Sequence, residues 1–455
     1  MRIFPILMLT MCCLGAAAQN TDSLRVKKIV DEVMANSKAY DNLRFLCKQV
    51  GPRLSGSPQA AQAVKATAQM LKDAGADTVY LQACMVPNWV RGAKEQGKIM
   101  LDKKQSFDLH LAALGNSVGT GPKGITGDVV EVSSFDELTA LGEAGVKGKI
   151  VFFNFAMNPT YINTFRAYGE SGAGRRRGAA QAAKLGAVGV MVRSLASNPD
   201  DYPHTGGMQY NDSFPKIPAV AISTNDADRL SIEITTNESV KAYIKTNCVT
   251  LPKVESFNVV GEMRGTDLPN EIITVGGHLD SWDLGEGAND DGSGCVQSIE
   301  VLRALKATAL RPKRTIRAVM FMDEENSGAG GDKYFELAKN NQEQHIFALE
   351  SDAGGFTPRG FGFTTTPEKL EAIMRWKPLF YPYGVYEFRN GGGGSDINDL
   401  KNIGTTLCGL LPDSQRYFDI HHAATDVFEN VSRRELHLGA ANMAALVWLV
   451  SEYGL

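Results

Sequence analysis

Short apolar runs alternate with amphipathic segments along the C-terminal part of the chain. The runs span 271–276, 315–322, 345–350 and 405–411, and their short length and apolar character are typical of buried strands. Apolar residues at helical spacing predict helices at 294–307, 332–339 and 439–453. This alternation predicts an α/β fold with a mostly parallel central sheet flanked by helices.

The middle of the chain has a different pattern. Short β-type runs occur there with a single Ala/Gly-rich helix at 177–185, and these runs include 127–132, 149–153, 187–192 and 217–222. The change predicts an inserted β-rich domain over residues 115–254. The catalytic domain then has a first part at 19–114 and a second part, with the candidate chemistry, at 255–455.

The N-terminus has the pattern of a targeting segment. Arg2 precedes an apolar run from residue 3 to residue 14, and small residues follow at 16–18. The run is too short to span a bilayer, so we predict a signal peptide over residues 1–18 and a secreted or periplasmic protein. Lipidation at Cys12 or Cys13 is a second interpretation. The rest of the sequence predicts no membrane span.

The charge of the chain and the spacing of its cysteines indicate which partners and which cysteine chemistry to expect. The 455 residues carry a formal net charge of -4, with no basic stretch that would favour a nucleic acid partner. The cysteines beyond the signal peptide are scattered and lack metal-site spacing; they are Cys47, Cys84, Cys248, Cys295 and Cys408. Buried free thiols are therefore expected, although one disulfide is also compatible with the pattern.

Acidic residues and histidines cluster just after the predicted strands. The clusters are His278–Asp280, Asn289–Asp291, Asp323–Glu325, Glu350–Asp352 and His421–Asp426. In a parallel α/β sheet the carboxyl ends of the strands meet at one edge, so these loops should converge. Imidazole and carboxylate groups are the usual zinc ligands besides cysteine, and a carboxylate can bridge two ions.

Each cluster taken alone has an ordinary explanation as a turn, a cap or a solvated surface. Five clusters at the ends of successive strands, holding three of the chain's seven histidines, favour a metal site instead. Glu324 and Glu325 are adjacent residues that point differently, so one can bind a metal while the other remains free as a general base.

The ordered motifs resemble those of the co-catalytic zinc aminopeptidase family over nearly the whole mature chain. Segments of the insert, including 203–206 and 215–219, together with Gly391–Asp396, resemble the carboxypeptidase Q members of that family. The resemblance implies a zinc exopeptidase fold, a protease-associated-type insert, a homodimer and two zinc ions per chain. The implied metal ligands are His278, Asp290, Glu325, Asp352 and His422.

The resemblance also assigns a role to each of these residues. His278 and Asp352 would bind one ion, Glu325 and His422 the other, and Asp290 both, with a cis peptide bond after Asp290. The four-residue offset to Asp426 selects His422 over His421. Glu324 would be the general base, and Asp280 would orient His278.

The predicted function is a secreted dizinc exopeptidase that hydrolyses dipeptides or terminal residues of short peptides, using a metal-activated water. A general aminopeptidase of longer peptides is the alternative. A single-zinc acyltransferase like the glutaminyl cyclases, which share the fold, and a non-catalytic binding protein are disfavoured by the complete ligand set.

The terminal carboxylate of a dipeptide substrate would need a hydrogen-bond donor on the protein. The sequence does not identify the residue that provides it. The candidates are Arg193, His204 and the backbone of residues 391–394. The run Arg175–Arg177 is interpreted as a solvated helix start that could also meet a carboxylate.

Overall fold

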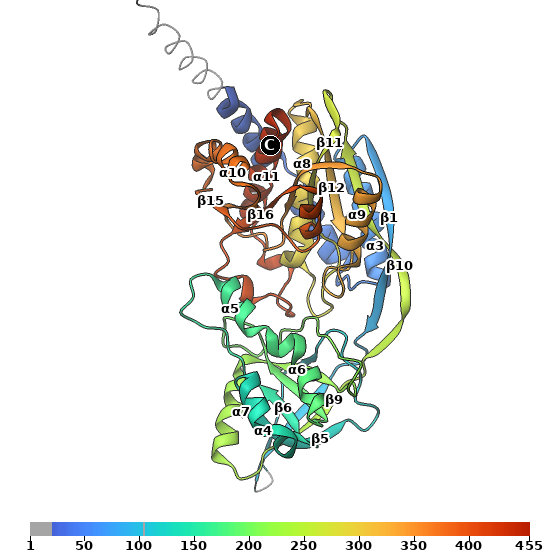
Figure 1. Ribbon diagram of the computed structural model, residues 1–455, viewed down its shortest axis with the longest axis vertical. Coiled ribbons are helices and arrows are strands. Elements are labelled where there is room, and N and C mark those ends of the chain that lie inside the picture. The colour runs from blue at the N-terminus through green and yellow to red at the C-terminus, as the bar shows by residue number, and fades with distance from the viewer. Residues whose placement is uncertain (1–20, 103–104) are drawn as a thin grey trace, which may run out of the picture.

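The computed structural model describes residues 21–102 and 105–455, so the predicted signal peptide lies outside the described residues. An eight-stranded sheet forms the main lobe, in the order β1-β10-β12-β11-β13-β16-β14-β15 (Figure 1). Its strands are β1 (Thr78–Val90), β10 (Val249–Met263), β11 (Leu268–His278), β12 (Arg314–Phe321), β13 (Gln344–Glu350), β14 (Pro358–Thr364), β15 (Glu387–Asn390) and β16 (Thr406–Pro412). The central strands β12, β11, β13 and β16 are parallel, as predicted, whereas β1, β10 and β14 introduce antiparallel pairs.

Helices cover both faces of this sheet because its central strands are apolar on both faces. Along β12, Ile316 and Met320 belong to the core that includes α8 (Ser293–Ala307) and α11 (Arg433–Tyr453). The alternating residues Val319 and Phe321 pack with α9 (Ala329–Asn340) on the other face. The remaining longer helices of this lobe are residues 21–36, α2 (Ala39–Phe45), α3 (Pro58–Asp73) and α10 (Pro367–Met374). Its short helices are η1 (Leu46–Val50), η3 (Ala288–Gly292), η4 (Lys377–Leu379), η5 (Tyr381–Tyr383), η6 (Asn398–Ile403), η7 (Tyr417–Asp419) and η8 (Phe428–Asn430). Among the described residues, none of the helices combines the length and apolarity that a membrane crossing requires.

A second eight-stranded sheet, in the order β3-β2-β9-β5-β6-β7-β8-β4, forms a separate lobe below the first in Figure 1. Its strands are β2 (Gln96–Met100), β3 (Ser106–Asp108), β4 (Leu111–Ala113), β5 (Ile125–Val132), β6 (Ile150–Phe153), β7 (Gly189–Arg193), β8 (Ala219–Ile222) and β9 (Lys241–Lys245). Its helices are α4 (Phe135–Val146), α5 (Thr164–Ser171), α6 (Ala173–Lys184) and α7 (Thr224–Thr236). Strands β5 to β8 are parallel, so this lobe is mixed α/β as well as rich in strands.

The predicted start of the inserted domain at residue 115 is too late, because the second sheet begins earlier in the chain. Strands β2, β3 and β4 precede residue 115 but belong to the second sheet. The long strands β1 and β10 pair up to Val90 and Val249, so residues 91–248, hereafter the second lobe, leave the main sheet between these two partners. Strand pairing between residues so far apart in sequence leaves no local signal, which is why the composition change alone placed the boundary too late.

The five cysteines beyond the signal peptide are all buried and unpaired in the structure. This agrees with the preference for free thiols and leaves the alternative of one disulfide unsupported. Burial accounts for the raised pKa of Cys47 and Cys84, each to about 12, which keeps these groups as neutral thiols.

Candidate active site

The predicted metal ligands come together at the carboxyl ends of the parallel strands. His278 ends β11, Asp352 follows β13 by two residues, and Glu325 lies in the turn after β12. His422 lies in the loop after β16, and Asp290 lies between β11 and α8. All five are buried or nearly so.

His278 lies at one end of the cluster. Its Nε2 atom is 3.1 Å from Asp290 Oδ1 and 3.4 Å from Asp352 Oδ1. Burial opposes protonation of this ring, but the hydrogen bonds with Asp290 and Asp352 outweigh burial and raise the pKa of His278. The three side chains present donor atoms within 4.8 Å of one another, close enough to hold one ion.

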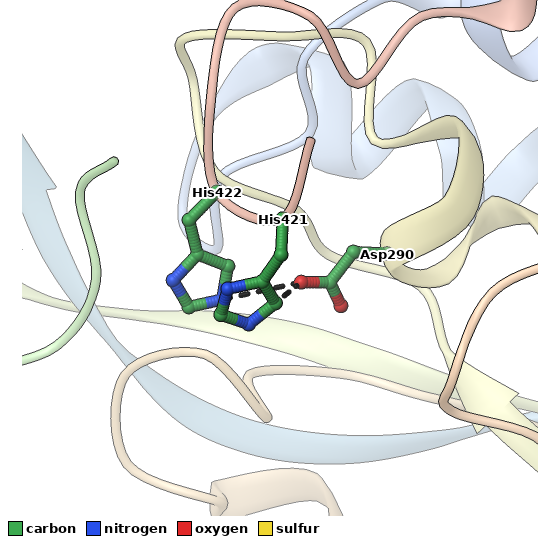
Figure 2. Close-up of side chains that lie close together, drawn as sticks. All are labelled: Asp290, His421 and His422. Atoms are coloured by element: carbon green, nitrogen blue, oxygen red, sulfur yellow. Dashed lines mark ion pairs between the residues drawn. The ribbon is translucent and has the colours of Figure 1, made fainter. Parts of the chain in front are cut away.

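His422 lies at the other end, beside His421 (Figure 2). Its Nε2 atom is 3.1 Å from Asp290 Oδ2 and 3.1 Å from Glu325 Oε2. His421 stacks on His422 and also faces Asp290, but its Nε2 atom is 3.6 Å from Oδ2. Asp290, His421 and His422 also present donor atoms within 4.8 Å of one another. The contact with Glu325 distinguishes His422 from His421, and the choice of His422 as the ligand stays a prediction.

Asp290 connects the two ends of the cluster because its two carboxylate oxygens face different histidines. Oδ2 of Asp290 and Oε1 of Glu325 are buried without a hydrogen-bond partner. Burial raises the pKa of Asp352 to about 6 and that of Glu325 to about 8, so the cluster favours bound positive charge. Carboxylate and imidazole donors suit zinc, and a shared carboxylate suits a pair of ions.

Asp280 supports both His278 and the turn after β12. Its backbone carbonyl accepts a hydrogen bond from His278 Nδ1 at 3.0 Å, whereas its carboxylate is 3.8 Å from that atom. The carboxylate instead accepts the backbone N–H groups of Asp323 at 2.7 Å and Glu324 at 3.1 Å. One residue thus fixes the first histidine and the backbone of the predicted base.

The loop that carries Asp290 is held from several sides. The Asp290–Asp291 peptide bond is cis, which confirms the implication of the resemblance. Asp426 accepts the N–H group of Asp290 at 3.1 Å. Arg53, which sequence analysis did not single out, is fully buried and donates to the carbonyls of Leu279 at 2.8 Å and Gly287 at 2.8 Å. Its targets are backbone atoms, so no motif could have revealed it.

Comparison with known proteins gives the family of the chain. The description "Peptidase family M28" matches residues 258–447, which include every residue of the cluster. Human carboxypeptidase Q is 38% identical over 420 residues, covering 92% of this chain and 85% of its own length. The chain belongs to peptidase family M28. It is therefore a metallopeptidase. Carboxypeptidase Q of Xenopus laevis is 35% identical, covering 98% of this chain and 95% of its own length.

Solved structures agree with this assignment. A peptidase M28 precursor from Shewanella amazonensis superposes with a TM-score of 0.90 at 29% identity, covering 95% of this chain and 97% of its own. A zinc aminopeptidase from Bacillus subtilis superposes with a TM-score of 0.65 at 20% identity, covering 90% of this chain and 94% of its own, which shows a shared fold.

In this M28 peptidase the cluster opens into a cavity of about 350 Å³ between the two lobes. The main lobe contributes Asp290, Glu324, Glu325, Asp352 and both histidines, and the second lobe contributes Tyr168, Arg175, Arg176 and Gln209. No other described residue donates a hydrogen bond to the Glu324 carboxylate. The carboxylate is thus free to meet a substrate or a water molecule.

The second lobe of this M28 peptidase corrects the interpretation of Arg175–Arg177. Helix α6 begins at Ala173, and Arg175 is buried, donating to the Tyr168 hydroxyl and to the Thr205 carbonyl at 3.3 Å. Arg176 is exposed at the cavity wall, and no ion pair joins it to an acid in the described part of the chain. The solvated-helix interpretation is therefore wrong for Arg175.

The other candidates for binding a carboxylate lie elsewhere. Arg193 pairs with Asp228 at 2.5 Å outside the cavity lining, and His204 is buried against His421. Residues 392–394 line a neighbouring cavity of about 590 Å³. A side chain at Gly394 would lie 2.0 Å from the buried Glu350 carboxyl carbon, so glycine is required there for close packing.

Proposed function

We propose that this M28 peptidase is a secreted or periplasmic exopeptidase that binds two zinc ions per chain and hydrolyses dipeptides or terminal residues of short peptides. The observation that carries the proposal is the position of Asp290. Its two oxygens face His278 and His422 separately, at 3.1 Å each, while Glu324, whose carboxylate has no partner among the described residues, lines the same cavity.

The donor set fits two catalytic zinc ions. His278, Asp352 and Asp290 would hold one ion, and His422, Glu325 and Asp290 the other. Each ion would then have three protein ligands, which is the pattern of catalytic zinc sites that keep a position open for water or substrate.

The reaction would use the following groups. When bound, the ions supply Lewis-acid chemistry that polarises the scissile carbonyl and makes the attacking water more acidic. Glu324 accepts the proton of that water and delivers it to the leaving amine, so that water is divided between the two products. Asp280 keeps Glu324 in reach, since its carboxylate holds the Glu324 backbone N–H at 3.1 Å.

The second lobe would select short substrates by covering one side of the cavity. The volume of about 350 Å³ suits a dipeptide better than an extended chain. Acidic side chains around the zinc site would attract a free α-amine, and the unpaired Arg176 would attract a terminal carboxylate. Arg176 thereby replaces Arg193 and His204 as the candidate anchor for the substrate's carboxylate.

A substrate panel with the Arg176→Gln variant tests this proposal. We expect the variant to lose about 10–100-fold in kcat/KM for a dipeptide, because a charge-assisted hydrogen bond to the terminal carboxylate is lost. The C-terminal amide of the same dipeptide should be hydrolysed slowly and equally by wild type and variant. The measurement is kcat/KM for both substrates and for the N-acetyl dipeptide.

Arg177→Gln is the matched control. Arg177 is exposed on the same helix, but its guanidinium lies over the Phe135 ring at 5.5 Å and does not line the cavity. Equal losses on the acid and the amide, or equal effects of the two substitutions, would contradict a carboxylate-binding role for Arg176. Preferential cleavage of the N-acetyl dipeptide would contradict the requirement for a free amine.

A general aminopeptidase of longer peptides is the second candidate, and one observation favours it. The neighbouring cavity of about 590 Å³ shares Phe165, Asp352 and Ser395 with the first, so the two cavities adjoin at the metal cluster. A hexapeptide hydrolysed as fast as the dipeptide would favour this function.

Three further parts of the proposal rest on sequence and resemblance. Secretion rests on the predicted signal peptide at residues 1–18, and N-terminal sequencing of exported protein should begin at Gln19. The second lobe is proposed as a protease-associated-type domain. A homodimer is proposed as the assembly, and light scattering of the purified protein measures its mass.

A further inference from the structure

A short segment of the second lobe lies directly against the two adjacent histidines of the active site. The Thr205 N–H group donates to the His422 carbonyl at 3.0 Å, and His422 Nδ1 faces the Thr205 carbonyl at 3.2 Å. His204 Nδ1 faces the His421 carbonyl at 2.6 Å. Residues 204–205 and 421–422 therefore contact each other through both backbone and side chains.

These contacts fix which atom of His422 faces the acids. The Thr205 carbonyl is 3.2 Å from Nδ1 of His422 and Arg175 Nη1 is 3.4 Å from the same atom, so Nδ1 faces the second lobe. The Nε2 atom of His422 is the one that lies 3.1 Å from both Asp290 and Glu325. The second lobe thus holds the direction of the His422 ring from its Nδ1 side.

The backbone at His422 needs support from outside its own loop. His422 has a φ of 62°, in the left-handed region that residues with a side chain rarely adopt. The carbonyl groups of His421 and His422 are both held by residues 204–205, on either side of this conformation. The second lobe therefore braces the turn that presents the ring.

His204 contributes through its imidazole and has no place in the cavity. It is 1% exposed, and it is not among the residues that line the cavity. Its backbone N–H group donates to Ser194 Oγ at 2.8 Å, which ties it to the end of β7. Because Nδ1 faces a carbonyl, it carries the hydrogen and acts as a donor.

Docking of the two lobes does not depend on His204. Arg91 of the second lobe pairs with Asp283 at 2.6 Å, and Thr164 donates to the Ser414 carbonyl at 3.0 Å. Arg91 also donates to the Thr205 hydroxyl at 3.4 Å, so its pair with Asp283 adjoins the 204–205 segment. The contact between Thr164 and Ser414 involves neither that segment nor the two histidines, so loss of one histidine leaves the lobes joined.

We propose that His204 is a positioning residue of the metal centre, which holds the His421 carbonyl so that His422 presents Nε2 to the metal. The inference rests on the proposed role of His422 as a ligand. It makes the second lobe part of the zinc site in addition to a wall of the cavity.

The test compares His204→Asn with His204→Gln. The Asn side chain carries an N–H group close to the position of Nδ1, whereas Gln has the same amide one carbon further from the backbone. Zinc affinity is measured by chelator competition on the full-length protein, with the melting temperature of the metal-free protein as a check on folding. The expected result is that Gln weakens one of two zinc-binding steps by about 10–100-fold. The other zinc-binding step should not change in His204→Gln, and His204→Asn should bind zinc with the affinity of wild type.

His422→Ala is the reference variant, because it tests the ligand role of His422 separately from the positioning role of His204. If His422→Ala leaves both zinc steps unchanged, the ligand assignment in the proposed function fails. If His422→Ala loses one step while His204→Gln binds zinc as wild type, the positioning role is overturned. Equal weakening of both steps by His204→Gln, with a lower melting temperature, also overturns it, because a general structural role then explains the result. His204→Ala, which removes the donor without adding bulk, carries the same expectation as His204→Gln if the latter does not fold.

Discussion

Glu324→Gln should retain its metal ions but lose about 10²–10⁴-fold in kcat, the usual effect of removing a general base. The glutamine keeps the size of the side chain and its place in the cavity but cannot accept a proton. Glu324 is suited to that role because its carboxylate is unpartnered among the described residues, while its backbone is fixed by Asp280. The measurement is single-turnover kinetics alongside elemental analysis.

Glu325→Gln is the control for this prediction because it changes the adjacent residue in the same way. Glu325 Oε2 is 3.1 Å from His422 Nε2, so this substitution should lower zinc affinity, and added zinc should restore part of the activity. A Glu324→Gln enzyme with the kcat of wild type would show that another group is the base.

Asp290→Asn should lose both zinc ions and nearly all activity, whereas wild type reconstituted with zinc should hold two ions per chain. The reason is that Asp290 faces His278 with one oxygen and His422 with the other, and an amide offers neither the charge nor a second acceptor. Elemental analysis after reconstitution and removal of free zinc measures the content of each variant.

Asp352→Asn is the matched control, because Asp352 contacts only the His278 end of the cluster in the described structure. The Asp352→Asn protein should lose a single zinc ion. Wild-type protein that never exceeds one zinc per chain would contradict the two-ion proposal. An Asp290→Asn protein that still holds two would contradict the bridging role.

The central strands and the grouping of acids with histidines at their ends could be predicted because their signals are local. Buried parallel strands are largely apolar runs, and β11, β12, β13 and β16 each contain such a run in the sequence, although Arg317 interrupts the run in β12. The acids and histidines follow these runs at once, and parallel strands bring their ends together. The family resemblance added the roles, which the distances around Asp290 support.

The parts that could not be predicted depend on contacts between distant residues. Strands β2 to β4 are short and precede the composition change, so only their pairing assigns them to the second sheet. Arg175 appears in sequence as one of three equivalent arginines, and only helix α6 decides that it is buried while Arg176 is exposed. The sequence offers His204 only as a candidate donor to a substrate carboxylate, because its partner His421 is 217 positions away.

The second lobe leaves and rejoins the main sheet at neighbouring positions, Val90 and Val249. A tight hairpin turn could join these two residues without moving any strand that carries a metal ligand. If the second lobe selects short substrates as proposed, a larger or smaller lobe at this point would change the length of accepted substrate and leave the central strands in place. The contact at residues 204–205 sets one condition on such a change, since any replacement lobe must bring its own partner for His422.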